Sequence, residues 1–188
     1  PSLSGDALGD LRLFESAKAL ALLDVPPPFS PRLPDGELMN HRDALSIALD
    51  TWLTEMRPQK VITYGLDGGY GHPDHLAVTQ ALVELNRNRT FELWQTVFPE
   101  GVFDELRGFL NRVHPKLLSE AAAHRVVQPK LVLNSSELFK QKRSALELFE
   151  TQLHGRSVES FLGKRAMRHI LSEEHFAPMD IHDVGREC

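Results

Sequence analysis

Apolar residues alternate along this chain between helical and strand-like spacing. Spacings of three and four residues predict helices over 10–24, 42–56, 73–86, 102–112, 137–152 and 157–171. Shorter apolar or alternating runs predict strands over 60–66, 91–98 and 125–133. The last strand contains Pro129, which cannot donate to a ladder and therefore favours an edge position. Helices and strands that alternate in this way predict an α/β fold.

The ends of several elements carry their own signals. Asp10 is a plausible N-cap for the first helix, and Ser135 or Ser136 for the helix that begins near residue 137. The apolar face of the first helix is expected at Leu11, Phe14, Ala17, Leu20 and Ala21. Residues 25–36 are rich in proline and predict an irregular loop. From residue 177 onward we expect an arm or a disordered tail.

The turn between strand 60–66 and helix 73–86 is the strongest candidate for an active site. It reads Gly-Gly-Tyr-Gly-His-Pro-Asp-His over residues 68–75. The glycines permit left-handed or cramped backbone, and Pro73 suits the first helical position. His72 and His75 would then lie about one turn apart on the same side, at the strand end where open α/β sheets bind ligands. The spacing alone fits equally a turn whose histidines cap backbone groups or face water.

The run from Asp67 to His75 resembles the second metal motif of the LmbE-like (PIG-L) deacetylases. That family contains N-acetylglucosaminyl-phosphatidylinositol de-N-acetylases and the mycothiol and bacillithiol deacetylases. Weaker similarities cover most of residues 8–155, at the Arg-x-x-Glu helix 12–15, the Pro-Asp-Gly turn 34–36, the Arg-Pro pair 57–58 and the Lys-x-x-Ala-Leu helix 142–152. The resemblance implies a Rossmann-like three-layer sandwich with a mostly parallel sheet, formed by one domain over 1–176 with a tail over 177–188.

The resemblance also implies a zinc-dependent N-deacetylase. A zinc ion with an open position lowers the pKa of its bound water and polarises a carbonyl, which is what hydrolysis of an unactivated amide requires. His75 is the expected metal ligand, and iron or manganese remain alternatives to Zn²⁺. His72 is expected to stabilise the oxyanion or protonate the leaving nitrogen. Asp74 could hydrogen-bond the histidine ring, and Tyr70 would help polarise the carbonyl or, alternatively, be a packed aromatic residue with a wet hydroxyl.

Substrate contacts are expected from two further residues. Arg12 matches the arginine that faces the substrate in the family, where a guanidinium suits sugar hydroxyls or a phosphate. A surface arginine paired with Glu15 at i+3 explains Arg12 equally well. Asp35 could bind a sugar hydroxyl, although aspartate between proline and glycine is also ordinary turn chemistry. The expected substrate is a small N-acetylated sugar conjugate.

One departure from the family pattern affects the metal site. The family begins with a strand that ends in His-Pro-Asp-Asp-Glu, and no such run occurs among the 188 residues. We expect the first strand and its loop to lie upstream of Pro1. Two alternatives remain open. The chain could be a non-catalytic relative that binds a sugar-like ligand or a partner protein without metal. It could also be a different zinc hydrolase with a convergent His-x-x-His, whose missing ligands would map to His41 or His114.

Composition narrows the partners. The net charge of −5 argues against nucleic acid, and no apolar run is long enough to span a membrane. The single cysteine, Cys188, excludes an intramolecular disulfide and favours a cytoplasmic location. A homo-oligomer is possible, with Trp52, Trp94 or the helix 157–171 at its interface.

Overall fold

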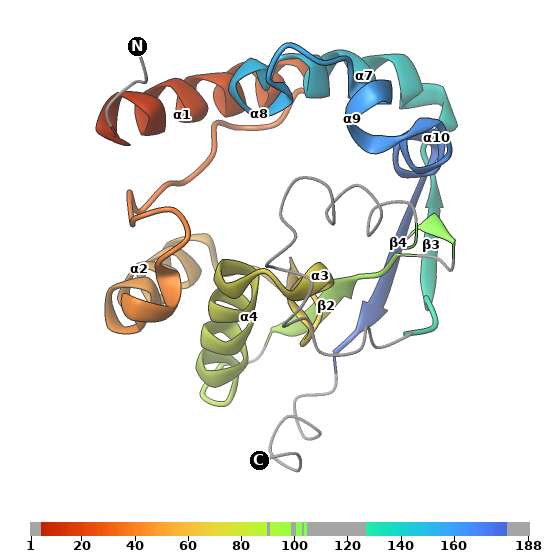
Figure 1. Ribbon diagram of the computed structural model, residues 1–188. Coiled ribbons are helices and arrows are strands. Elements are labelled where there is room, and N and C mark those ends of the chain that lie inside the picture. Colours follow the sequence, from red (N-terminus) through yellow and green to blue (C-terminus); the bar gives the residue numbers. More distant parts are fainter. Residues whose placement is uncertain (1–4, 90, 99–100, 103, 105–126, 180–188) are drawn as a thin grey trace. The chain divides into compact units, whose positions relative to one another are not determined.

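The computed structural model in Figure 1 describes residues 5–89, 91–98, 101–102, 104 and 127–179. It has a mixed α/β fold. Its longer elements are α1 (Gly5–Leu22), α2 (Arg42–Met56), β1 (Lys60–Thr63), α4 (Pro73–Asn86), β2 (Glu92–Thr96), β3 (Leu131–Asn134), α7 (Phe139–Glu147), α10 (Lys164–Ser172) and β4 (Glu173–Pro178). Its short helical turns are η1 (Leu38–Asn40), α3 (Gly68–Gly71), η2 (Ser136–Leu138), α8 (Glu150–Leu153) and α9 (Val158–Leu162).

The sheet is mixed and has the strand order β1-β2-β4-β3. β1 pairs in parallel with β2, where Val61 lies opposite Leu93. β2 pairs antiparallel with β4, where Gln95 lies opposite Ala177. The strand predicted over 125–133 lies at an edge as expected, because β3 is the last strand in this order, but β3 begins at Leu131 and leaves Pro129 outside the ladder.

The chain forms two compact units. The histidine unit comprises Leu33–Gly101, Leu110–Val132 and His175–Cys188, and the α1 unit comprises Pro1–Arg32, Val102–Phe109 and Leu133–Glu174. In the histidine unit α2 packs on α4, and a core cluster is formed by Leu53, Val61, Leu82, Val83, Phe91, Leu93 and Met179. In the α1 unit α1 packs on α7, and a core cluster is formed by Leu153, Val158, Met167 and Leu171. Each unit therefore has its own hydrophobic core.

Two predicted helices match the structure residue for residue. These are α2 and α4, and both have strong local end signals. α2 ends at Arg57, which has the left-handed conformation. The N–H of Arg57 donates to the carbonyl of Leu53. α4 begins with His72 as its N-cap and Pro73 as its first residue. Local chemistry was enough to fix these boundaries.

The first helix differs from its prediction at the cap and on its buried face. α1 begins by Gly5, so Asp10 lies inside the helix and the predicted cap is wrong. Phe14 is 60% exposed, whereas Glu15 and Ala19 are buried. The buried carboxylate of Glu15 accepts hydrogen bonds from the N–H and the hydroxyl of Thr151 in α8. A polar contact from a distant segment therefore selects the inward face of α1.

The C-terminal helices are more broken than predicted. The range 137–152 divides into η2, α7 and α8, and the range 157–171 divides at Gly163, which has φ +86°. The predicted serine cap is wrong, because Ser135 makes no capping hydrogen bond and the side chain of Asn134 accepts the N–H of Ser136 instead. β4 continues to Pro178 and Met179 is buried, so the expected tail cannot begin at residue 177. Most of the predicted helix 102–112 and the remainder of the tail lie outside the described residues.

Candidate functional site

The site begins where the chain leaves β1. A Cβ atom on Gly65 would lie 2.7 Å from the Asp67 carboxylate and 2.9 Å from the Gln95 amide oxygen, so a larger residue here would displace one of these side chains. Asp67 then accepts the N–H of Gly69 at 2.8 Å and caps the one-turn helix α3. The glycines of this turn, Gly68, Gly69 and Gly71, have φ of +69°, +76° and +84°. The expected left-handed glycine turn at the strand end is therefore confirmed.

The two histidines lie on the same side of the first turn of α4. The carbonyl of His72 accepts the first helical hydrogen bond, from the N–H of Leu76 at 3.1 Å. The rings of His72 and His75 stack with centroids 4.7 Å apart and an interplanar angle of 28°. Sequence spacing therefore predicted their proximity correctly.

His75 has its ring orientation set by the backbone of the glycine turn. Its Nδ1 lies 3.0 Å from the carbonyl oxygen of Gly68. Because a carbonyl only accepts, this bond assigns the proton of the neutral ring to Nδ1 and the lone pair to Nε2. Burial lowers the pKa of His75 despite the Gly68 bond, and the neighbouring His72 lowers it further. A neutral imidazole whose other nitrogen donates to a carbonyl is the form that proteins use to bind metals.

His72 has the opposite arrangement. Its Nδ1 accepts the backbone N–H of Asp74 at 3.2 Å, which also makes it the N-cap of α4. This bond requires a lone pair on Nδ1, so the neutral ring carries its proton on Nε2. In this geometry the ring offers a hydrogen-bond donor at Nε2, whereas protonation of Nδ1 would break the cap. Nε2 of His75 is therefore suited to bind a metal through its lone pair, whereas Nε2 of His72 is suited to donate a hydrogen bond to an oxygen.

Asp74 lies in the same turn and is almost completely buried, with 7% of its surface exposed. One carboxylate oxygen accepts the N–H of Gly36 at 2.6 Å, and the other accepts the N–H of Leu38 at 3.0 Å. The Pro-Asp-Gly turn that contains Asp35 is thereby attached to the first turn of α4. The bond between Asp74 and the ring of His72 uses the backbone N–H of Asp74.

Two further predicted site residues, Tyr70 and Arg12, are not placed beside the histidines by the described side chains. Tyr70 lies in α3, and its side chain is not among those that the structure describes. Arg12 lies in α1 and belongs to the α1 unit. The structure therefore brings His72, Asp74, His75 and the Asp35 turn together within one unit.

Sequence reasoning missed two residues, one that stacks on His75 and one that lies beside Gly65. Tyr64 stacks on His75 with ring centroids 3.6 Å apart and parallel planes, and burial raises the pKa of its hydroxyl. Gln95 reaches the turn from the end of β2. The available signal was their position, because both come at or just beyond the ends of neighbouring parallel strands, where ligand-binding residues gather.

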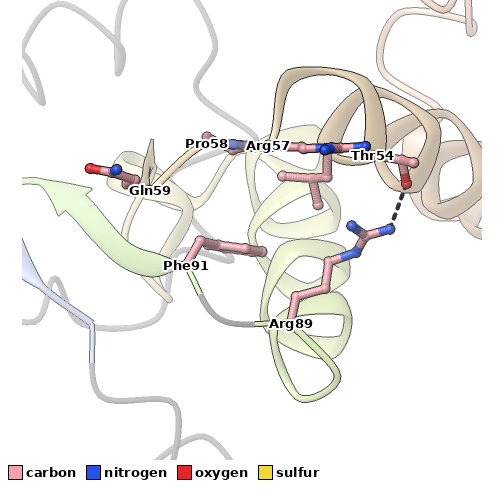
Figure 2. A pocket seen from close by; sticks show the side chains of 7 residues that line it. Thr54, Arg57, Pro58, Gln59, Arg89 and Phe91 are labelled. Carbon is pink, nitrogen blue, oxygen red and sulfur yellow. Dashed lines mark hydrogen bonds between the residues drawn. The ribbon is translucent and has the colours of Figure 1, made fainter.

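A cavity of about 390 Å³ lies at the other end of β1 (Figure 2). It is lined by Leu53, Thr54, Arg57, Pro58, Gln59, Arg89 and Phe91. The guanidinium of Arg89 is held there by hydrogen bonds to Thr54, at 2.8 Å, and to Asp50. Because Pro58 and Gln59 precede β1 whereas the histidines follow it, this cavity is separate from the candidate site.

Comparison with known proteins agrees with the motif at residues 67–75. Residues 2–86 match the family described as GlcNAc-PI de-N-acetylase (PIG-L). This part of the chain is thus similar to the PIG-L family. This PIG-L match includes both histidines, Asp74, Asp35 and Arg12.

Individual proteins that this chain resembles are named as deacetylases. The chain is 52% identical over 46 residues to a 1D-myo-inositol 2-acetamido-2-deoxy-alpha-D-glucopyranoside deacetylase of Rhodococcus jostii (strain RHA1), over 23% of this chain and 16% of that protein. It is 36% identical over 120 residues to the protein of the same name from Acidothermus cellulolyticus, over 53% of this chain and 41% of that protein. The matched segments thus span less than half the length of these curated relatives.

The fold is similar to that of a solved deacetylase. The zinc-inhibited form of teicoplanin deacetylase superposes with a TM-score of 0.53, at 15% sequence identity, over 93% of this chain and 76% of that chain. At this identity the likeness concerns the fold alone. In the part of the chain that the structure describes, every helix is too short or too polar to cross a membrane.

Proposed function

We propose that this protein is a metal-dependent amide hydrolase that removes the N-acetyl group from a small molecule containing an amino sugar. The observation that supports it most directly is the opposite hydrogen bonding of the two histidine rings. His75 donates from Nδ1 to Gly68, and His72 accepts at Nδ1 from Asp74. The deacetylase names of the relatives indicate the substrate class.

We infer that His75 supplies one ligand to a divalent metal, with Zn²⁺ as our first choice. His75 would hold it through Nε2, since its Nδ1 is already committed to a backbone carbonyl. Structural and catalytic zinc sites use about three or more protein ligands, so the site requires further ligands besides His75. When bound, zinc supplies an activated water and polarises the amide carbonyl.

The residues of the chain perform the remaining tasks in this proposal. His72 donates from Nε2 to the oxygen that becomes negatively charged as the amide is attacked, because its own Nδ1 is held as an acceptor. Tyr64 covers one face of the His75 ring and limits its rotation. Tyr70 and Arg12 keep the roles that the resemblance implies, in polarising the carbonyl and binding substrate. Asp35 would bind a sugar hydroxyl from the Pro-Asp-Gly turn.

The proposal extends to the surroundings of the site. We propose that the complete fold is a three-layer Rossmann-like sandwich with a mostly parallel sheet, and that the two units together form one functional domain that includes β4. A cytoplasmic location is proposed from the single cysteine. A homo-oligomer remains part of the proposal, with Trp52, Trp94 or the segment predicted as a helix over 157–171 at its interface.

Elemental analysis of the purified protein tests the metal site. We expect His75→Asn to lose most of the zinc bound by the wild-type protein, because it removes the Nε2 ligand. His154→Asn is the matched control, since His154 is exposed, ends α8 with φ +52° and tolerates asparagine, so it should retain the metal. The same proteins are then assayed for acetate release from an N-acetylglucosamine–inositol conjugate, with and without a chelator.

The outcomes separate the candidate functions. Zinc lost only in His75→Asn, together with chelator-sensitive acetate release, supports the hydrolase. Wild-type protein without metal or acetate release would overturn it and favour the non-catalytic, ligand-binding relative. Metal retained in His75→Asn would reject His75 as the ligand and favour a site built elsewhere in the chain.

A further inference from the structure

The buried carboxylate of Asp74 connects two parts of the candidate site that are far apart in sequence. Its two oxygens accept the N–H groups of Gly36 and Leu38, across separations of 38 and 36 residues. Its own N–H donates to His72. We infer that Asp74 is a positioning residue, which holds the Asp35 turn beside His72 and thereby sets the affinity for the substrate. This inference rests on the proposed function.

The geometry favours a tether over a direct chemical role. Both carboxylate oxygens are engaged by backbone N–H groups, at 2.6 and 3.0 Å, and the residue is 7% exposed. Hydrogen bonds from N–H groups to a charged carboxylate are roughly twice as strong as neutral ones. The N-terminal end of α4, a 14-residue helix, adds a favourable dipole to the negative charge. The Asp74 carboxylate is therefore engaged by the backbone of the Asp35 turn.

The two bonds leave Asp35 little freedom to move. Pro34 restricts the backbone before it, and Gly36, whose N–H is bonded to Asp74, follows it with φ +81°. The backbone of Asp74 at the same time fixes the ring of His72. A substrate held by Asp35 would thus be held at a defined place relative to His72, which is how positioning residues raise affinity.

The turn has a second anchor, which makes the tether testable without unfolding the protein. Leu33, Leu38 and Met39 pack against the cluster formed by Leu45, Ala77 and Ala81. Loss of the two polar bonds should therefore loosen the turn locally while these apolar contacts remain.

The test is Asp74→Asn compared with Asp43→Asn. Asparagine keeps one accepting oxygen but turns an NH₂ group toward a backbone N–H, so one of the two bonds is lost. Asp43 is the second residue of α2 as Asp74 is the second residue of α4, and it is exposed, so its substitution removes the same charge at the same helical position without touching the turn. Amide hydrogen exchange at Gly36 and Leu38, the dissociation constant for N-acetylglucosamine, and kcat and KM of deacetylation are measured for each protein.

We expect Asp74→Asn to speed exchange at Gly36 and Leu38 by about tenfold or more and to raise the dissociation constant and KM by about tenfold, corresponding to about 1.4 kcal/mol. The kcat should change much less, and Asp43→Asn should match the wild type. Unchanged amide hydrogen exchange at Gly36 and Leu38 in Asp74→Asn would show that Asp74 does not hold the Asp35 turn. Faster exchange with unchanged sugar affinity, or a loss confined to kcat, would overturn the role in substrate affinity. A wild-type protein without deacetylation would refute the proposed function alone, because exchange and sugar binding still decide the tether.

Discussion

Gly68 determines where the ring of His75 can lie. Its carbonyl accepts the Nδ1–H of His75, and its φ of +69° is a conformation that glycine adopts at little cost. A Cβ atom at this position would lie 3.0 Å from Cγ of Leu76. The backbone conformation of Gly68 therefore determines the orientation of the His75 side chain, seven residues later.

Replacing Gly68 by alanine should damage both the fold and the metal site. We expect a loss of about 1–3 kcal/mol in the free energy of unfolding, because the substitution combines positive-φ strain with a close contact. We also expect weaker zinc binding, because the carbonyl that orients His75 must shift. Urea denaturation and zinc titration measure the two effects.

Gly155→Ala provides the matched comparison. Gly155 has φ +75°, but a Cβ atom there would meet nothing within 4 Å. Gly155→Ala should therefore lower the free energy of unfolding through positive-φ strain alone, without a steric contact, and leave the zinc affinity unchanged. Equal effects of the two substitutions on zinc binding would contradict the role assigned to Gly68.

At the same scale, sequence identified the histidines but not the partners of Asp74. His72 and His75 are three residues apart beside a glycine turn, so their proximity follows from local geometry. The bonds from Asp74 go to Gly36 and Leu38, which no local pattern specifies. A long-range contact of this kind appears only when the loop has been placed on the helix.

Among the elements, α1 and α8 are joined by one buried carboxylate. Glu15 is 5% exposed and accepts the N–H of Thr151 at 2.9 Å and its hydroxyl at 2.6 Å. Thr151 lies in the first turn of α8, so Glu15 satisfies an N–H that a helix start leaves without an intrahelical partner. A carboxylate on α1 thereby takes over a role that a local cap usually fills.

Glu15→Ala should therefore destabilise the α1 unit. We expect a loss of about 1–3 kcal/mol in the free energy of unfolding, since two bonds to a buried charge are removed and the N–H of Thr151 loses its acceptor. Chemical denaturation followed by circular dichroism measures it. Glu147→Ala, which removes an exposed pair with Arg143, should cost about 0.5 kcal/mol or less. Similar losses for both variants would mean that the Glu15 contact contributes no more than a surface ion pair.

The helices also show which boundaries sequence can predict. α2 was predicted correctly from the apolar spacing over 42–56, and the start of α4 from Pro73, which is visible in the sequence. The later helices were predicted too long. The helix is interrupted at Leu148 and Phe149, between α7 and α8, and at Gly163, between α9 and α10, and apolar residues continue across both breaks. Periodicity reports which residues are buried, but not whether the backbone stays helical between them.

For the whole molecule, two separate cores raise the question of cooperativity. Leu53 and Leu171 are each 1% exposed, and they belong to the core clusters of the histidine unit and the α1 unit respectively. The composition of this chain offers a selective probe, because both of its tryptophans, Trp52 and Trp94, lie in the histidine unit. Tryptophan fluorescence therefore reports on one unit, whereas far-ultraviolet circular dichroism reports on the helices of both.

We expect the two units to respond separately to loss of a core leucine. A Leu→Ala substitution in a core costs about 2–5 kcal/mol. Leu171→Ala should lower the denaturation midpoint seen by circular dichroism more than the midpoint seen by fluorescence, because its cluster contains no tryptophan. Leu53→Ala should lower the fluorescence midpoint directly. Coincident shifts of both signals in both variants would show instead that the units unfold as one cooperative structure, since coincidence of independent probes is the test of a two-state transition. The site of His72 and His75 would then depend on the stability of α1 as well, and substitutions far from the histidines would alter metal binding through unfolding alone.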